Sequence, residues 1–398
     1  MTSSTSARST SARPTIPATR FVERLTAARG RAATAGVDAI LVGVGADLRY
    51  LAGYPAMGLE RLTMLVVPAH GDWSLVVPRL EAAPARLCPA AAAGNLPVVT
   101  WEEGDDAYAV VAGLVEGAGG AISGRDFRIA VSDDLPARHL LPLQDHLVGA
   151  RFSVASAVLR ELRMVKDTDE IALLTLAAHA ADRVVAQVAG GPLIGRTEAE
   201  VANDVRARLI AEGHDEALFA IVGSGPNSAS PHHEASDRVI RAGEPIVLDI
   251  GGSLGGYASD ITRTLWVTGG DTAKGPDERF RHLFGVLHGA QAKARAAVRP
   301  GIACQAVDAA ARQPIVAEGY GEAFFHRTGH GIGLEGHEEP YIIAGNTEPL
   351  RDGMAFSVEP GIYLPGEYGA RIEDIVVCGA NGPIELNQAP RELYVVDG

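Results

Sequence analysis

The chain has 398 residues, of which 47% are hydrophobic and 21% charged, and its formal net charge is −14. This composition excludes disorder over most of the length, because disordered chains hold fewer apolar residues and more charge per residue. The length suffices for two domains with cores of their own. The acidic balance, with no basic stripe to offset it, argues against nucleic acid or an anionic membrane as a partner.

The cysteines and the N-terminal residues bear on where the protein works. Three widely spaced cysteines without a C-x-x-C pair disfavour a disulfide framework and a thiolate zinc site, and they indicate a cytoplasmic location. Residues 1–20 are rich in Ser and Arg and lack the apolar core of a secretory signal. We expect a disordered tail there, although its composition faintly resembles an organelle transit peptide.

Residues 21–157 alternate short apolar runs with turn residues, which predicts a compact α/β domain. A helical pattern over 22–36 ends at Gly36, and four apolar runs predict buried strands at 39–44, 63–68, 73–78 and 128–133. We find no nucleophile, metal cluster or phosphate-binding loop in this part of the sequence.

The second domain, residues 158–398, is predicted to begin with an amphipathic helix. Asp167 and Glu170 form a D-x-x-E start, apolar residues follow at alternating spacings of three and four, and Gly190 ends the pattern.

An internal repeat organises the rest of this domain. Residues 211–225 and 317–331 match at an offset of 106 residues, and downstream Gly243, Asp249 and Gly251 match Gly353, Glu359 and Gly361. A helix precedes each half, at 197–213 and 303–319, and Pro314 is expected to kink or shorten the second. We therefore predict two modules related by a pseudo-two-fold axis that close over one shared site.

Each module interrupts apolar strands with carboxylates. In the first, Asp249 lies in PIVLDIGG, and a hairpin turn at Gly255-Gly256 brings Asp260 back beside it. A buried carboxylate is costly unless it is paired or bound to a cation. The alternative for Asp260 is a salt bridge to Arg263.

The second module repeats the arrangement with Glu359 and Glu373. Strand alternation puts Arg371 and Glu373 on one face and Asp374 on the other. Four inward carboxylates repel one another unless cations neutralise them. With His330, flanked by glycines, they suit two divalent ions such as manganese, cobalt or zinc. The alternative for a lone histidine is a satisfied core residue.

Three shorter patterns lack their structural context. Gly331, Gly333 and Gly336 form G-x-G-x-x-G, but Pro340 and acidic residues follow where a phosphate-binding helix should begin. His337-Glu338 does not start H-E-x-x-H, because position 341 is tyrosine. The sequence GSG at 223–225 lacks the spacing of a nucleophile elbow.

Several ordered motifs together carry a family resemblance. The motifs are IVGSGPNSASPHHEASD, IVLDIGG, ASDITRT, FFHRTGHGIGLEGHEEP, FSVEPGIY and ARIEDIV. From about residue 158 to the C-terminus the chain resembles the pita-bread metallopeptidases, in the branch of Xaa-Pro dipeptidases and Xaa-Pro aminopeptidases. More loosely, residues 38–55 resemble the start of the creatinase-like N-terminal domain of that branch.

The resemblance implies a dinuclear metal centre. It makes Asp249 a ligand of one ion and His330 and Glu359 ligands of the other. Asp260 and Glu373 would bridge the two. It also implies that a hydroxide bridging the ions attacks the scissile carbonyl, with Glu359 as general base.

Further residues match substrate-side positions of the family. His232, His326 and His337 resemble histidines that bind substrate, stabilise the tetrahedral intermediate or carry the proton to the leaving nitrogen. Arg371 and Tyr363 match positions that orient ligands or substrate. For His326 the alternative is core packing, and for Arg371 it is core packing or a bridge to Glu373. Only one of His232 and His233 can face the metals, because neighbouring residues on a strand point opposite ways.

The expected function is that of a metal-dependent exopeptidase cleaving the bond before proline, an Xaa-Pro dipeptidase first of all. The alternatives are an Xaa-Pro aminopeptidase on longer peptides, a non-peptidase hydrolase or lyase of the same fold, and a non-enzymatic binding module. Manganese is the first expectation for the metal, with cobalt, zinc or iron as the others. The partners expected are a small peptide substrate and, from the resemblance, a second copy in a homodimer.

Overall fold

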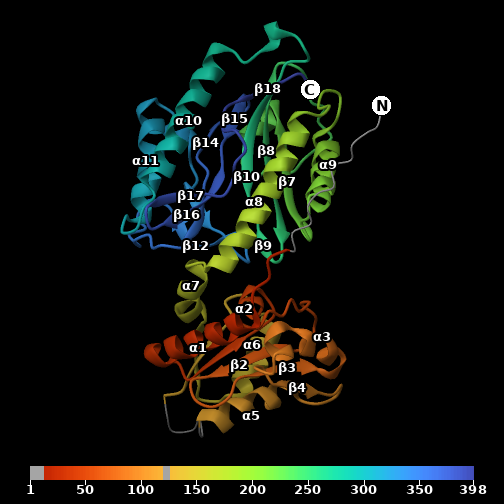
Figure 1. Cartoon of the computed structure of the whole chain (residues 1–398), viewed down its shortest axis with the longest axis vertical. Helices are drawn as coiled ribbons and strands as arrows, with labels where there is room; N and C mark the ends of the chain where they lie inside the picture. Colours follow the sequence, from red (N-terminus) through yellow and green to blue (C-terminus); the bar gives the residue numbers. More distant parts are fainter. Residues whose placement is uncertain (1–12, 120–125) are drawn as a thin grey trace.

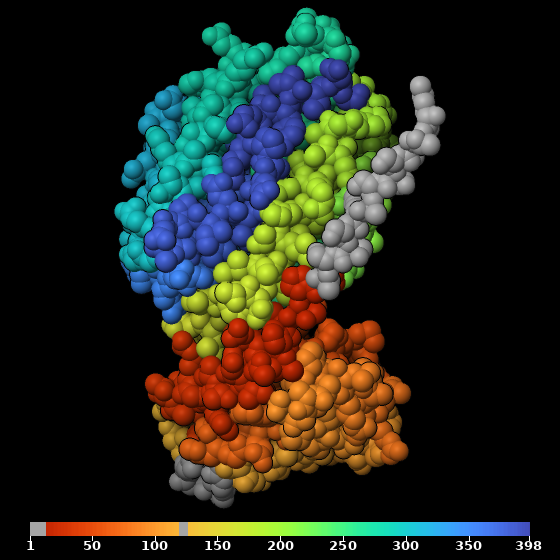
Figure 2. Space-filling model, in the orientation of Figure 1, coloured from red at the N-terminus to blue at the C-terminus, as the bar shows by residue number. Residues whose placement is uncertain are grey.

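A computed structural model describes residues 13–119 and 126–398, so most of the predicted tail lies outside the described residues. Figure 1 shows an N-terminal α/β domain below a larger C-terminal domain, with helix α7 (Ser156–Met164) running between them. Figure 2 shows the two domains as separate lobes joined at a narrower waist.

The N-terminal domain is built on a six-stranded sheet with the order β4-β3-β2-β1-β5-β6. Its strands are β1 (Ala39–Val42), β2 (Met64–Pro68), β3 (Ser74–Pro78), β4 (Val98–Trp101), β5 (Arg128–Val131) and β6 (Arg151–Val154). Its helices are α1 (Ala18–Ala35), α2 (Ala46–Ala52), α3 (Ala82–Leu87), α4 (Pro89–Ala92), α5 (Ala107–Gly119) and α6 (Ala137–His146), with a 3₁₀ turn at Arg79–Glu81.

Helices cover both faces of this sheet, which explains why its strands are apolar without alternation. On β1, Ile40 and Val42 pack into a core with α1, whereas Ala39 and Leu41 pack into a second core with α5. The four predicted strands are confirmed, and α1 ends as predicted at Gly36, which has a left-handed φ of 69°.

Helix α1 begins at Ala18, so the last three residues of the predicted tail, 18–20, are helical. Arg20 on its first turn forms an ion pair with Asp167, and Phe21 is buried. Arg13 also contacts the C-terminal domain through Asp215, at 2.8 Å. Residues close to the chain start therefore fasten the two domains together.

The C-terminal domain contains two five-stranded sheets. The first has the order β18-β10-β8-β7, with β9 paired to β8: β7 (Glu216–Ser224), β8 (Glu244–Leu254), β9 (Tyr257–Ala258), β10 (Ile261–Val267) and β18 (Tyr394–Val396). The second has the order β12-β11-β13-β16-β17: β11 (Gly329–Gly331), β12 (Glu338–Ile342), β13 (Ala355–Val358), β16 (Asp374–Gly379) and β17 (Gly382–Glu385). A separate hairpin pairs β14 (Gly361–Leu364) with β15 (Tyr368–Arg371).

The two sheets confirm the predicted internal repeat. Helices α8 (Thr168–Ala189) and α9 (Glu198–Ala211) precede β7, and α10 (Glu278–Ala297) and α11 (Cys304–Ala317) precede β11. The order β7-β8-β10 in one module then recurs as β11-β13-β16 in the other. An isolated bridge between Thr262 and Glu373 joins the sheets at their centre. In Figure 1 the helix pairs flank the sheets from opposite sides.

Local sequence patterns set the ends of these elements. Capping boxes form at Asp167–Glu170 for α8 and at Thr197–Glu200 for α9, as predicted. Pro314 does not end α11, which runs on to Ala317, because the interruption lies within the last turn of the helix. Short 3₁₀ turns lie at Gly225–Ala229, Thr272–Lys274 and Gly321–Ala323.

Helix α8 is the one described helix that is long and apolar enough to cross a membrane. It instead packs against the first sheet, where Val184, Val185 and Val188 join the core. This is the placement of a core helix in a globular domain.

Helix α7 belongs to both domains, and the boundary predicted after residue 157 falls inside it. Its Val158 and Leu159 pack into the core of the N-terminal domain, whereas Met164 packs into the C-terminal domain. Arg163 at its end pairs with Asp47 of the first domain and with Glu338 of the second.

Candidate metal centre and its surroundings

A cavity of about 700 Å³ opens between the two sheets of the C-terminal domain. The predicted site residues on its wall are His232, Asp249, Asp260, His326, His330, His337, Glu359, Arg371 and Glu373. Tyr363 is buried behind the wall. The topology brings together residues that lie up to 141 positions apart in the sequence.

The carboxylates enter the cavity from equivalent strands of the two modules. Asp249 lies on β8, and Asp260 immediately precedes β10 after the left-handed turn at Gly255-Gly256. Glu359 directly follows β13, and Glu373 directly precedes β16. The relative exposures of Asp249, Asp260 and Glu373 are 7%, 4% and 2%, so these charges are removed from water.

His330 on β11 completes the cluster. One ligand atom each from Asp260, His330 and Glu373 lies within 4.8 Å of the others. The Nε2 atom of His330 is 3.3 Å from Glu359 Oε1 and 3.8 Å from Asp260 Oδ2. The glycines beside it are required, because a Cβ on Gly329 would lie 1.8 Å from the carbonyl oxygen of Ser357.

The hydrogen bonds of His330 define which nitrogen faces the carboxylates. Its Nδ1 is 3.1 Å from the carbonyl oxygen of Gly331, which can only accept, so Nδ1 carries the proton. Burial is the main cause that lowers the pKa of His330, to about 3, so the ring is neutral. The bare Nε2 therefore points a lone pair at carboxylate oxygens, an arrangement that a cation between them stabilises.

The electrostatics of the carboxylates fit a divalent ion as well. Burial, followed by the neighbouring carboxylates, raises the pKa of Asp260 and of Glu373 well above the ordinary range. Burial likewise raises the pKa of Glu359, to about 7. The buried Oδ1 atoms of Asp249 and Asp260 have no hydrogen-bond partner among the described residues. Orphaned oxygens and a neutral imidazole are a suitable ligand set for hard or borderline divalent metals.

Arg371 on β15 forms its ion pair with Asp249. The alternative raised by the sequence, an ion pair with Glu373, is not what the structure shows. Its Nη2 is 2.5 Å from Asp249 Oδ2, and its Nε donates to the hydroxyl of Thr262. The guanidinium is buried, so it offsets part of the carboxylate charge before any metal binds. Although burial opposes it, Tyr363 and the nearby carboxylates hold the pKa of Arg371 well above its usual value.

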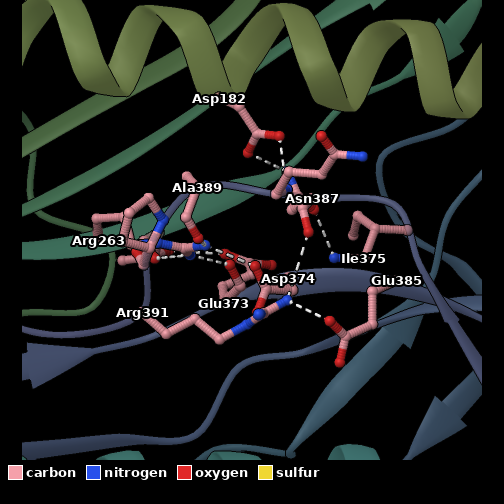
Figure 3. A network of polar contacts seen from close by, with 12 residues as sticks. Asp182, Arg263, Glu373, Asp374, Ile375, Glu385, Asn387, Ala389 and Arg391 are labelled. Carbon is pink, nitrogen blue, oxygen red and sulfur yellow. Dashed lines mark hydrogen bonds and ion pairs between the residues drawn. The ribbon is translucent and has the colours of Figure 1, made fainter.

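Arg263 pairs with Asp374, so the alternative that it bridges Asp260 is wrong. Asp260 and Arg263 are three residues apart and point to opposite faces of the strand. Figure 3 shows Arg263 and Asp374 within a network of polar contacts that also includes Asn387 and Arg391. Arg263 Nη2 is 2.7 Å from Asp374 Oδ1, and its Nη1 donates to the carbonyl oxygen of Glu373.

The same network fastens the strand that carries Glu373 to other elements. Asp374 also accepts a hydrogen bond from Gln291 on α10 and pairs with Arg391 in the C-terminal segment. Asn387 accepts from the backbone N–H of Ile375 and donates to Asp182 on α8 (Figure 3). In Figure 2 this C-terminal segment, in dark blue, runs along the surface beside α8.

His326 lies in a chain of hydrogen bonds on the cavity wall. Its Nδ1 donates to the carbonyl oxygen of Arg327, at 2.7 Å, which leaves Nε2 as an acceptor. The hydroxyl of Tyr363 lies 3.1 Å from that Nε2 and accepts from Arg371 at 2.8 Å. Burial is the main cause that lowers the pKa of His326, to about 4.

His337 has the opposite tautomer. A guanidinium nitrogen of Arg327 lies 3.1 Å from its Nδ1, and because arginine can only donate, Nδ1 accepts and the neutral ring carries its proton on Nε2. Burial, then Arg327 and His232, lowers the pKa of His337, so the ring is neutral near pH 7. His337 can therefore donate a hydrogen bond to an oxygen in the cavity.

His232 lines the cavity, whereas His233 turns away and bonds to Glu198 on α9. This geometry assigns the two members of the pair to different surroundings, which the sequence left open.

Two polar residues of the site escaped the sequence analysis. The hydroxyl of Thr262 donates to Glu373 Oε2 at 2.7 Å and accepts from Arg371. Alternation could have identified it, because Thr262 is two residues from Asp260 and shares its face of the strand. Arg327 sets the tautomer of His337. No sequence pattern indicated this role, apart from the position of Arg327 next to His326.

Two family descriptions and several relatives match this chain. The description of metallopeptidase family M24 matches residues 172–380, and that of the creatinase/prolidase N-terminal domain matches residues 24–165. A protein of Mycobacterium tuberculosis named "Probable dipeptidase PepE" is 48% identical over 377 residues, which cover 94% of this chain and 96% of that protein. An Xaa-Pro dipeptidase of Pyrococcus horikoshii is 32% identical over 358 residues, with 90% and 94% coverage.

A solved structure extends the similarity to three dimensions. The crystal structure of dipeptidase PepE from Mycobacterium ulcerans has a TM-score of 0.88 and 47% sequence identity, and it covers 96% of this chain and 99% of that one. Both domains and the whole C-terminal site fall within the matched regions. The chain is thus a member of metallopeptidase family M24, with the creatinase/prolidase type of N-terminal domain.

Proposed function

We propose that this protein is an Xaa-Pro dipeptidase that uses two divalent metal ions, manganese first among them. The observation that carries the proposal is the buried cluster of Asp260, His330 and Glu373, with Asp249 and Glu359 beside it, at a cavity wide enough for a dipeptide. When bound, the ions supply Lewis acidity and lower the pKa of a water to about 7. Dipeptidases among the relatives support this substrate class.

The residues around the cluster have roles that follow from their protonation. Glu359, whose carboxylate lies beside His330 at the edge of the cluster, is suited to accept the proton of the attacking water. His337 holds a proton on Nε2 and is suited to donate to the oxyanion as it develops. Tyr363 orients His326 on the leaving-group side, and Arg371 holds Asp249 in place as a ligand.

The remaining expectations belong to the same proposal. We infer a cytoplasmic homodimer without nucleic-acid or membrane partners. All three cysteines are buried and free, which fits a reducing compartment. Size-exclusion chromatography with light scattering tests the homodimer.

A peptide assay tests the function. Metal-stripped protein is reloaded with manganese, cobalt or zinc and offered Ala-Pro and a longer peptide that begins with Ala-Pro. We expect hydrolysis of Ala-Pro, and slower or no hydrolysis of the longer peptide. Preference for the longer peptide would make the protein an Xaa-Pro aminopeptidase. Turnover of neither peptide with any of the metals would refute the peptidase proposal.

A further inference from the structure

A second buried carboxylate, outside the metal cluster, organises the loop that carries His232. Glu198, the first residue of α9, has a relative exposure of 0%. It accepts hydrogen bonds from the backbone N–H and the hydroxyl of Ser224, from the Asn227 amide and from both the N–H and the hydroxyl of Ser236. His233 Nε2 is its remaining partner in this loop, at 2.7 Å. One carboxylate thus gathers polar groups from both ends of a 13-residue segment, 224–236.

The electrostatics show that this carboxylate stays charged. Burial alone raises the pKa of Glu198, but hydrogen bonds from Ser236 and Ser224 outweigh it and lower that pKa to about 2. A charged acceptor strengthens each bond to it, so the carboxylate acts as a fixed anchor rather than a titrating group.

The other side of the same loop is fastened to the metal site. The carbonyl oxygen of Pro231 accepts from Arg371 Nη2 at 3.2 Å, and the hydroxyl of Ser228 accepts from the backbone N–H of Gly369 at 2.9 Å. Arg371 in turn pairs with Asp249. His232 is therefore held between two anchors, Glu198 on α9 and Arg371 on β15.

We propose that Glu198 and His233 are positioning residues that fix the loop so that His232 faces the substrate cavity. The inference rests on the proposed function, because it assigns His232 to the substrate side of that site. The backbone N–H of His233 donates to the carbonyl oxygen of Ser230 and closes a turn over residues 230–233, so the bond from His233 to Glu198 holds the turn that presents His232 to the cavity. His232 lies near enough to His326 and His337 to contribute to the lowering of their pKa values.

Substitution of His233 tests the positioning role. His233→Phe keeps the ring but removes the donor, whereas His233→Gln keeps an N–H that can reach Glu198. With Ala-Pro as substrate, we expect His233→Phe to lower kcat/KM about tenfold or more, because small misplacements of a substrate-binding group are costly, and His233→Gln to recover most of it. Metal content should stay at the wild-type level in both. His282→Phe is the matched control, since it removes an exposed histidine–glutamate contact with Glu318, and neither residue lines the cavity.

A double-mutant cycle separates positioning from a general structural role. If His233 acts through His232, then His233→Phe should cost little once His232→Ala has removed the positioned ring. Independent losses that multiply in the double variant would overturn the inference, as would unchanged kinetics in His233→Phe.

Amide hydrogen exchange gives a readout that needs no substrate. We expect faster exchange in residues 224–236 of His233→Phe and of Glu198→Gln, with the metal-binding strands unchanged. Unaltered exchange in that loop would overturn the inference even if the protein cleaved no Xaa-Pro peptide. If the wild type cleaved no Xaa-Pro peptide but residues 224–236 exchanged faster in the variants, the proposed function would be refuted and the positioning role would stand.

Discussion

Replacement of Arg263 by methionine tests whether the buried network in Figure 3 supports the metal centre from behind. Arg263 is 1% exposed and donates to Asp374 and to four backbone carbonyl oxygens, those of Thr262, Glu373, Ala389 and Pro390. Methionine has a similar length and fills much of the same space, so the substitution removes the donors with little loss of packing.

The expected cost follows from these contacts. Breaking a buried ion pair by removing one partner costs about 3–5 kcal/mol. Asp374 keeps its contacts with Gln291 and Arg391, which lowers this cost. Each buried carbonyl oxygen that loses its donor adds about 1 kcal/mol or more. We therefore expect about 5 kcal/mol, which lowers the melting temperature of a domain of this size by roughly 10 °C or more.

The functional consequence is a weaker metal site. Arg263 holds the backbone of Glu373, and loss of such support to a metal ligand lowers affinity about 10- to 100-fold. Calorimetric titration with the metal measures the loss of affinity, and thermal unfolding measures the loss of stability. Arg391→Met is the control, because Arg391 reaches the same Asp374 from the surface with 17% of its side chain exposed, and we expect a cost of about 1 kcal/mol.

Two results would refute the reasoning about Arg263. One is a melting temperature of Arg263→Met within about 2 °C of the wild type. The other is a large loss of stability with unchanged metal affinity, which would mean that the network supports the fold but not the position of Glu373.

Three further predictions concern the cavity itself. Asp260→Ala or Glu373→Ala should reduce the metal content from about two ions per chain, and stoichiometry equal to that of the wild type by elemental analysis would rule out the site. Metal-stripped protein should lose stability as the pH rises from about 5 through 7, because burial raises the pKa of Glu359 to about 7 and the folded state then holds a proton that the unfolded state releases. Added manganese should therefore stabilise more at pH 8 than at pH 5.5 in thermal unfolding, and a metal-free stability that rises with pH would contradict this. Tyr363→Phe should lower kcat about tenfold with unchanged metal content, because it removes the hydroxyl between His326 and Arg371, and an unchanged kcat would exclude that role.

The sequence by itself determined the two-domain α/β fold and identified the residues of the candidate metal cluster. Continuous apolar runs such as 39–44 indicated strands covered on both faces, and the caps at Asp167 and Thr197 marked where helices begin. A carboxylate inside an apolar strand is rare enough to be noticed, and the repeat showed that Asp249 and Glu359 occupy matching places. Such patterns are local, so they can be recognised in the sequence without knowing which residues contact them in the folded protein.

Only the tertiary structure decided which polar groups pair. Arg371 bonds to Asp249 across 122 residues, Arg263 to Asp374 across 111, and His233 to Glu198 across 35. The sequence alternatives for the two arginines chose carboxylates two or three residues away. Side-chain partners depend on strand register and on how two sheets meet, and a bridge such as Thr262–Glu373 joins chain segments whose proximity no local pattern records. The residues of the candidate site can therefore be identified from the sequence, whereas the polar groups that hold them in place depend on how the sheets pack.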